Sequence, residues 1–423
     1  SPPLPVQKRP AAKKQPEAKK IILPSGVRLI LKEDHALPIV AITACFQGGL
    51  LAETPKNNGI GALMAHCITK GTRERSSLEV AETIEKTAGQ LEGFSGKNSF
   101  GLRSEFLAEY TEKALGLFFE VLFEPAWDPK EFAKEKAFNL EAIRNLEDNL
   151  SALAFHHFQK TLFNHHPYGM RELGDKKSLQ ALTPAHLKQW HQKILGAKNM
   201  VLSMVGDISE KEGAALLNKH LGGLSKKGYP FAKPPSARKP GQIQRTVVTK
   251  KKEQAHLVLG FLGPTFTSPD YYPMTVLNDI LSGMGGRLFI ELRDKLSLAY
   301  SVTSVYSAGL DPGYFAVYIG CEPAKVSTAT QAIQKELEKI IAAPVEPKEL
   351  EKTKQHLVGT YELELQRNLG LSQMFGFDEL YGQGFKDVLR FPEKILRVTR
   401  EDVLNAAKKY IDLKSYVLSI VQP

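Results

Sequence analysis

The segment RLFIELRDKLSLAYSV (287–302) carries two side chains able to donate hydrogen bonds, Arg293 and Tyr300, seven residues apart. Its pattern predicts a helix that runs into a strand starting near Leu298. The end of such a helix and the start of such a strand can present both side chains to one point. Taken alone, the two residues are more typical of a surface ion pair and a core aromatic residue.

The histidines give little support for a metal site. The pairs at 156–157 and 165–166 are adjacent in sequence, and adjacent residues on a helix do not share a face. His66 stands alone in the apolar segment GIGALMAHCITKGT (59–72). A single imidazole cannot hold zinc, which takes three or four protein ligands. The pattern therefore favours a partly buried, hydrogen-bonded histidine at this position.

The formal net charge of +10 is concentrated in two segments. Residues 1–20 hold six basic residues and one acidic residue, and residues 225–252 hold nine basic residues and no acidic one. With +5 and +9 removed, the rest of the chain carries −4. We therefore predict solvated, flexible basic segments and no nucleic-acid partner, with contact to an anionic surface as the alternative. The three cysteines lie in apolar runs without a C-x-x-C pair, which predicts buried free thiols.

The length of 423 residues predicts at least two domains. We predict a disordered basic tail over residues 1–20, an N-terminal domain over 21–224, a linker over 225–242 and a C-terminal domain over 243–423. The predicted linker packs four prolines and two glycines among basic residues. No apolar run approaches the roughly 18 residues that span a bilayer, so no transmembrane segment is predicted.

Helical and strand patterns alternate in the first half. We expect a hairpin at 21–34, a strand at 38–47, a largely buried helix at 57–71, a further helix at 77–89, a strand over 90–106 and long helical patterns over 109–123 and 129–163. The second half repeats the first. TPAHLKQWHQKILGAKNMVLSMVGD (183–207) matches TREDVLNAAKKYIDLKSYVLSIVQP (399–423) at a shift of 216 residues, and PKEFAKEKAFNLEAI (129–143) matches PKELEKTKQHLVGTY (347–361) at a shift of 218. The predicted fold is α+β, with two tandem homologous domains, each a mixed or antiparallel β-sheet covered by α-helices.

Several segments resemble the insulinase/pitrilysin zinc metallopeptidases, particularly their small bacterial members of two duplicated domains. GIGALMAHCITKGT resembles the family's zinc-motif helix, and HPYG (166–169), with the segment that follows it, resembles the block that ends in a V-G-D strand. RLFIELRDKLSLAYSV resembles a segment of the second domain in active enzymes. The resemblance keeps its order from about residue 21 to residue 423.

The resemblance also implies that the zinc motif is degenerate. The family's motif is H-x-x-E-H followed by K-G-T, and alignment on K-G-T (70–72) places His66 at the second histidine. The first histidine becomes Ala62, the general base becomes Ala65, and the later glutamate ligand falls at Ala142. We therefore expect no metal and no cofactor in this chain, and zinc only in a partner subunit.

For substrate binding, the resemblance implies that Arg293 holds a peptide carbonyl or carboxylate and that Tyr300 donates to the oxyanion of the tetrahedral intermediate. Family members also add the substrate as an extra strand beside an edge strand, which here corresponds to Phe94, Ser95 and Gly96. The two glycines of GFSGKNSF (93–100) weaken that segment as a strand.

These features predict a catalytically incomplete subunit of a heterodimeric zinc metallopeptidase. Its expected partners are a homologous zinc-bearing subunit and unfolded or extended peptides. The alternative is a non-catalytic structural or peptide-binding protein that keeps the peptidase fold. The expected location is the bacterial periplasm, with the cytoplasm as the alternative.

Overall fold

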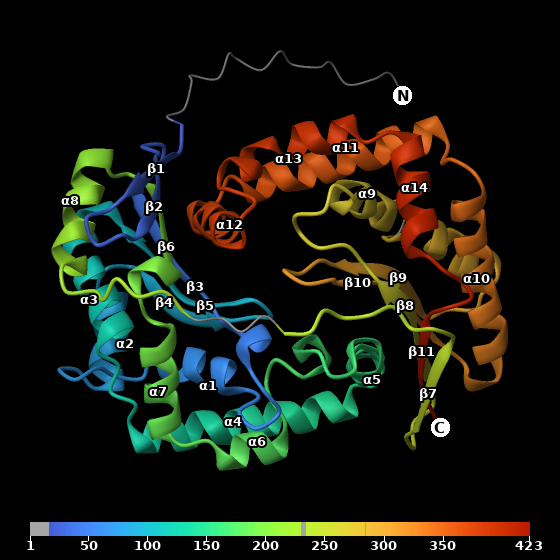
Figure 1. Ribbon diagram of the computed structural model, residues 1–423, viewed down its shortest axis with the longest axis horizontal. Coiled ribbons are helices and arrows are strands. Elements are labelled where there is room, and N and C mark those ends of the chain that lie inside the picture. The colour runs from blue at the N-terminus through green and yellow to red at the C-terminus, as the bar shows by residue number, and fades with distance from the viewer. Residues whose placement is uncertain (1–16, 230–233, 284) are drawn as a thin grey trace.

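The computed structural model describes residues 17–229, 234–283 and 285–423. Two β-sheets form the two halves of the molecule (Figure 1). In the first sheet the strand order is β1-β2-β6-β3-β5-β4, and in the second it is β7-β11-β8-β10-β9. The strands are β1 (Lys19–Ile22), β2 (Arg28–Glu33), β3 (Ile39–Gln47), β4 (Gln90–Ser95), β5 (Ser99–Leu107), β6 (Met200–Gly206), β7 (Gln244–Thr249), β8 (Ala255–Leu262), β9 (Ser301–Ser307), β10 (Tyr314–Cys321) and β11 (Val417–Gln422).

Helices cover both sheets, as the fold class α+β requires. In the first half they are α1 (Ile60–Cys67), α2 (Ser77–Glu85), α3 (Thr111–Phe123), α4 (Pro129–Asp148), α5 (Leu150–Phe163), α6 (Lys176–Ala181), α7 (Pro184–Ile194) and α8 (Glu210–Leu221). In the second half they are α9 (Tyr271–Leu281), α10 (Val326–Ala342), α11 (Pro347–Glu364), α12 (Asn368–Tyr381), α13 (Lys386–Arg397) and α14 (Arg400–Tyr410). Short turns of 3-10 helix lie at Leu50–Ala52, Ala108–Tyr110, Pro167–Gly169, Ala197–Asn199 and Pro323–Lys325, and a π-helix, η5, spans Phe289–Lys295.

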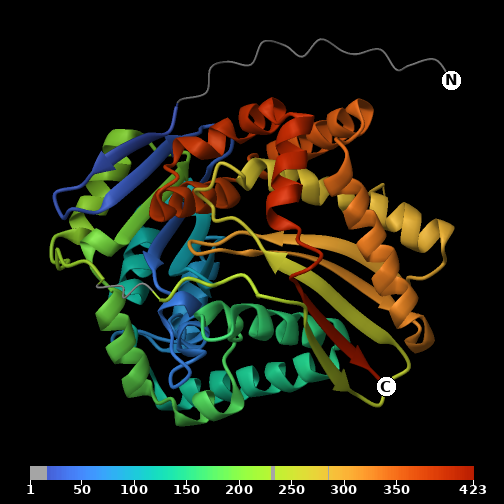
Figure 2. The ribbon, with the colours of Figure 1, turned by 45° about the vertical axis from the view of Figure 1, so that its right-hand side comes forward.

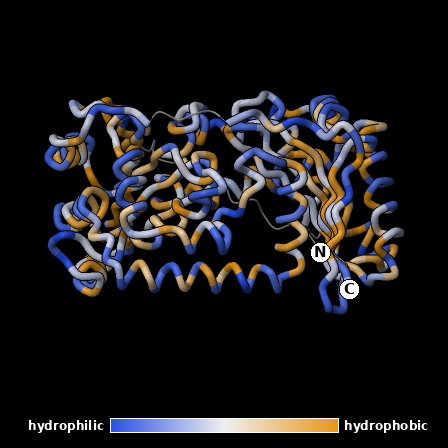
Figure 3. The backbone as a smooth tube through the Cα atoms, turned by 60° about the horizontal axis from the view of Figure 1, so that its bottom comes forward, coloured by the Kyte–Doolittle hydropathy of each residue, from blue (hydrophilic) through white to orange (hydrophobic). Residues whose placement is uncertain are grey.

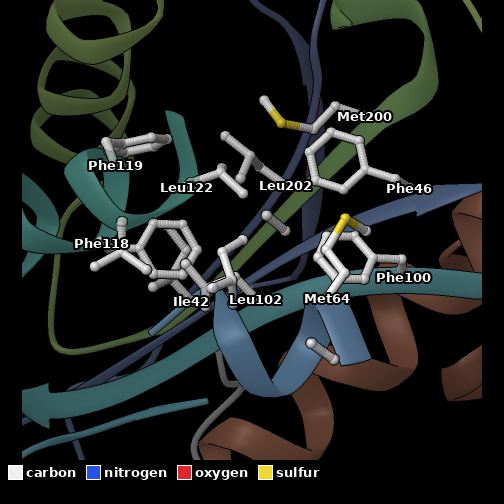
Figure 4. Close-up of a cluster of buried hydrophobic side chains, with 14 of the residues drawn as sticks. Ile42, Phe46, Met64, Phe100, Leu102, Phe118, Phe119, Leu122, Met200 and Leu202 are labelled. Carbon is white, nitrogen blue, oxygen red and sulfur yellow. The ribbon is translucent and has the colours of Figure 1, made fainter. Parts of the chain in front are cut away.

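Local sequence explains where these helices begin. Asp128 caps α4 by accepting the N–H groups of Lys130 and Glu131, and proline occupies the first helical position. Thr183 and Thr399 form matching capping boxes at the starts of α7 and α14. The apolar residues of the strands form the cores beneath the helices, and Figure 3 shows hydrophobic colour concentrated along the strands. Figure 4 shows part of the first core, where side chains from α1, α3 and the sheet meet.

The predicted repeat is present in the structure. The shift of 216 residues relates β2 to β7 and α7 to α14, and the shift of 218 relates α4 to α11 and α5 to α12. The order β2-β6-β3-β5-β4 of the first sheet corresponds strand by strand to β7-β11-β8-β10-β9 of the second.

Each half contributes one helix that packs on the sheet of the other half. Helix α12 of the second half packs on β3 and β6 of the first sheet, where Ser372 donates to the Ser203 carbonyl at 2.9 Å. Helix α5 of the first half packs on β8 and β11 of the second sheet, where Phe158 is fully buried. Figure 2 shows both helices against the sheet of the opposite half. Each sheet therefore depends on the other half of the chain for one of its covers.

Some expected boundaries differ in the structure. Residues 1–16 lie outside the described part of the chain, but Lys19 and Lys20 already belong to β1, so the ordered chain begins before residue 21. The strand expected over 90–106 is the hairpin β4–β5, turned at Gly96–Asn98. Of the expected linker, the described residues 225–229 and 234–242 have no helix or strand, and residues 230–233 lie outside the description. The three cysteines are free and buried, as predicted. Among the described residues, no helix is long and apolar enough to cross a membrane.

Candidate functional site

Helix α1, which carries His66, is held in place by its N-terminus. It begins after Gly59, whose φ of 89° lies in the left-handed region that favours glycine. The Glu53 carboxylate accepts the N–H groups of Gly59 at 2.7 Å and Gly61 at 3.0 Å, which satisfies donors that the first helical turn leaves free. Burial raises the pKa of Glu53 to about 7 despite these bonds. The buried Glu53 carboxyl group, whose pKa lies near neutral pH, therefore holds the N-terminus of α1 in place.

His66 makes the hydrogen bond expected of a structural histidine. Its Nδ1 lies 2.9 Å from the Asn139 side-chain oxygen on α4, so Nδ1 carries the proton and donates it to that oxygen. The edge of its ring meets the Phe138 ring at a centroid distance of 6.3 Å. The positions Ala62 and Ala65 are buried methyl groups. His66 is thus the one metal-binding group of this helix face, and it is already bonded.

The residues around His66 do not fit a zinc ion. A zinc site needs three or four deprotonated nitrogen, sulfur or oxygen ligands at about 2 Å. This site offers one imidazole, one amide and two methyl groups. Across the described parts of the chain, no three His, Cys, Asp or Glu side chains gather closely enough to hold a metal.

Asn139 is a site residue that sequence reasoning did not single out. It lies three residues before Ala142 and therefore close to the same face of α4. Asn139 is fully buried, whereas Ala142 is half-buried. The side-chain nitrogen of Asn139 has no partner among the described residues. A polar residue buried in the middle of an amphipathic helix is the signal that could have identified it.

Strand β4, which contains Phe94 and Ser95, is the edge strand of the first sheet and pairs only with β5 in the described structure. Gly96 lies just beyond it and donates its N–H to the Ser99 carbonyl in the turn. The Phe94 ring packs edge-on against Phe377 of α12, with centroids 5.5 Å apart. A side chain at Gly93 would lie 2.2 Å from the carbonyl oxygen of Ala65. The glycine that weakens this segment as a strand therefore allows α1 to lie directly against it.

Arg293 and Tyr300 both lie on the surface of the second half. Arg293 belongs to η5 and its guanidinium lies over the Phe289 ring, 4.6 Å from the centroid. Tyr300 is 55% exposed and precedes β9, with its N–H bonded to the Gly320 carbonyl. No hydrogen bond, ion pair or ring contact joins these two side chains. The expected helix is a π-helix that ends five residues before Tyr300. Both groups are accessible to a ligand from solvent.

The HPYG block forms a joint between the two halves. The His166 ring lies 3.1 Å from the Asp311 carboxylate, and both side chains are buried. The Tyr168 hydroxyl donates to Asn98 and accepts the N–H of Leu310. Close by, Lys97 donates to Ser307 of β9 at 3.2 Å, and burial lowers its pKa. The sequence predicted a structural turn here, and its contacts across the two halves were not foreseen.

Two sequence profiles of one protein family together match most of the chain. The sequence profile described as insulinase, peptidase family M16, matches residues 28–176, and the profile described as the peptidase M16 inactive domain matches residues 181–357. The chain belongs to the insulinase family. Within this family it is similar to an uncharacterized zinc protease, YmxG, of Bacillus subtilis, at 29% identity over 94% of this chain and 97% of the relative. It is also similar to an uncharacterized zinc protease of Streptomyces coelicolor, at 27% identity over 95% of this chain and 88% of the relative.

Solved structures share the insulinase-family fold. A crystal structure described as the peptidase M16 inactive domain from Pseudomonas fluorescens superposes with a TM-score of 0.90 at 24% identity, covering 96% of this chain and 98% of that one. A structure described as a protease from Helicobacter pylori has a TM-score of 0.90 at 21% identity, covering 97% and 100%. The boundary between the two family profiles separates His66 from Arg293 and Tyr300, so the two parts of the candidate site lie in different family domains.

Proposed function

We propose that this chain is a subunit of a two-chain zinc metallopeptidase and binds peptide substrate for a homologous partner that holds the zinc. The observation that carries this proposal is the contrast between the two parts of the site. The metal-binding positions around α1 are two alanines and a histidine bonded to Asn139. Arg293 and Tyr300 remain on the surface, where a buried structural role does not account for them.

The chemistry of each group fits a substrate-binding role. A guanidinium binds a peptide carbonyl or carboxylate through several donors at once. A phenol hydroxyl donates a hydrogen bond and stabilises negative charge that develops on an oxygen atom. The outer edge of β4 offers backbone groups that an extended peptide can pair with, whatever its side chains. The zinc and the general base would come from the partner chain.

The test mixes the purified chain with a homologous subunit that carries an intact H-x-x-E-H motif, and follows cleavage of an unstructured fluorogenic peptide. We expect activity from the mixture that neither chain shows alone. Tyr300→Phe is expected to lower kcat/KM by roughly 100-fold, the effect of removing one oxyanion donor. Arg293→Ala is expected to lower it comparably by weakening substrate binding.

Arg390→Ala is the matched control, because Arg390 is an exposed arginine on α13 of the same half. It is expected to leave the rate unchanged. If the mixture is active but both site variants match the control, Arg293 and Tyr300 do not bind substrate. If mixing gives no activity at all, the alternative of a non-catalytic structural or peptide-binding protein replaces this proposal.

A further inference from the structure

The two sheets differ at one corner, where β2 and β7 occupy equivalent places. The strands are related by the same shift of 216 residues, and both run parallel to the C-terminal strand of their own repeat. The register is also the same, because Arg28 pairs with Val201 and Gln244 pairs with Val417. The elements that cover β2 in the first half therefore show which covering elements β7 lacks in the second.

In the first half, this corner is closed twice. Strand β1 pairs with the outer edge of β2, with Ile21 opposite Leu29 and Lys19 opposite Leu31. Helix α8 covers the face, and a side chain at Gly213 would come within 2.8 Å of Leu31. Leu29 and Leu31 are consequently buried in the first core.

In the second half, the same corner is open within the described residues. Strand β7 pairs only with β11, and the N–H groups of Gln244 and Lys250 point toward that strand. Because backbone groups alternate along a strand, those of Arg245, Val247 and Thr249 point outward. Val247 is 47% exposed, whereas its counterpart Leu31 is buried. This outward edge has unpaired donors and acceptors and an apolar side chain beside them.

The open edge is also strongly basic. Arg245 lies on β7, and the turn between β7 and β8 (250–254) contains Lys250, Lys251 and Lys252 followed by one acidic residue, Glu253. The end of β7 that leads into this turn lies beside the C-terminus in Figure 1. None of these four basic side chains forms a salt bridge with any other described residue. Residues 225–252 contain no acidic residue. Lysines on an edge strand also protect it from random pairing, so charge alone does not establish a binding site.

We propose that the outer edge of β7 binds an extended acidic segment of another protein, which adds to the sheet as β1 adds to β2. The charge distribution selects this occupant. The chain's own residues 1–20 carry six basic residues and one acidic one, so they would be repelled. A second copy of the chain pairing through the same edge would bring like charges together. An acidic strand gains both backbone pairing and charge complementarity. This site is independent of Arg293 and Tyr300.

The probe is a capped ten-residue peptide of alternating Glu and Val, titrated into the full chain with amide hydrogen exchange as the readout. We expect slower exchange at Arg245, Val247 and Thr249 when the peptide is bound. The same peptide with Lys at each Glu should bind at least about tenfold more weakly at low salt.

Two variants separate strand addition from loose charge attraction. Val247→Pro removes an outward N–H but no bond to β11, so it should abolish protection, whereas Val247→Thr, which keeps that N–H, should retain it. Lys251→Glu with Lys252→Glu should weaken binding about tenfold, and the equal charge change Lys176→Glu with Lys177→Glu on α6 should not.

Unchanged exchange across β11 will show that Val247→Pro still folds. The proposal is overturned if the peptide binds without protecting β7. It is also overturned if Lys176→Glu with Lys177→Glu weakens binding as much as Lys251→Glu with Lys252→Glu does, or if no binding is detected.

Discussion

The segment around α1 and the segment from η5 to β9 each resemble a part of the peptidase site, and they have opposite characters. Around α1, Ala62 and Ala65 are buried and His66 is bonded to Asn139. From η5 to β9, Arg293 and Tyr300 are exposed. One segment is therefore packed in the interior of the fold, and the other is accessible to solvent.

Helix α1 lies in close contact with β4. Gly93 lets the strand approach the Ala65 carbonyl, and a side chain at Gly61 would lie 2.6 Å from the Ser95 hydroxyl. Glycine on each element permits this close approach. The second half has no equivalent demand on Arg293 or Tyr300, because neither lies in its core. The difference teaches that two segments of one repeated fold can differ in exposure, one packed in the interior and the other open to solvent.

The largest expected effect tests whether the two halves form one folding unit. Phe158 of α5 is fully buried in the cluster that joins α5 to the second sheet. Phe158→Ala should lower the free energy of unfolding by about 3–5 kcal/mol, because it removes a large side chain and leaves a cavity. Chemical denaturation followed by circular dichroism measures this loss.

Phe138→Ala provides the matched control, because Phe138 is 65% exposed on the neighbouring α4. It should cost less than about 1 kcal/mol. If Phe158→Ala melts the second half alone, leaving a cooperative transition for the first, the reciprocal helices do not couple the two halves as the structure indicates.

The next largest effect concerns the buried carboxyl group that fixes α1. Burial raises the pKa of Glu53 from its usual value of 4.5 to about 7. The folded protein therefore binds this proton more tightly than the unfolded chain, and the stability contribution is present at low pH and lost as pH rises from 4.5 through 7. At about 1.4 kcal/mol for each pKa unit, the change is on the order of 3 kcal/mol.

Glu53→Gln should remove this dependence. The free energy of unfolding is measured at steps from pH 4.5 to pH 8. As the pH rises, that of the parent protein should fall relative to that of the Glu53→Gln variant. Glu74→Gln changes an exposed carboxyl group and should follow the unmodified chain. A variant curve parallel to that of the unmodified chain would show that Glu53 is ionised in the fold throughout this range.

Much of the fold could be predicted from the sequence, because it depends on local signals. The hairpin of β1 and β2, helix α1 and the two-fold repeat follow from apolar periodicity, turn residues and sequence matches at constant spacing. Pairings between distant segments could not be predicted in the same way. An amphipathic pattern shows that α5 and α12 each bury a face, but not that each covers the sheet of the other half.

The candidate site could also be predicted only in part from the sequence. The substitutions at Ala62 and Ala65 are visible in the sequence, since they depend only on alignment to a short motif. The bond from His66 to Asn139 joins residues 73 positions apart. The contacts of His166 and Tyr168 with the loop at 308–313 span about twice that distance in sequence. No local pattern marks these partners, because three-dimensional packing alone brings them together.

The smallest effects sharpen the contrast between the two segments. His66→Ala leaves the buried Asn139 oxygen without its hydrogen bond and should cost about 1–3 kcal/mol of unfolding free energy. Arg293→Ala loses only its contact with Phe289 and should cost at most about 1 kcal/mol. Tyr300→Phe removes an exposed hydroxyl and should change stability by less than about 0.5 kcal/mol. Thermal and urea denaturation of the three variants under one buffer provide the comparison. If Arg293→Ala proves as costly as His66→Ala, then Arg293 supports the fold, and the distinction between a packed segment and an accessible one does not hold.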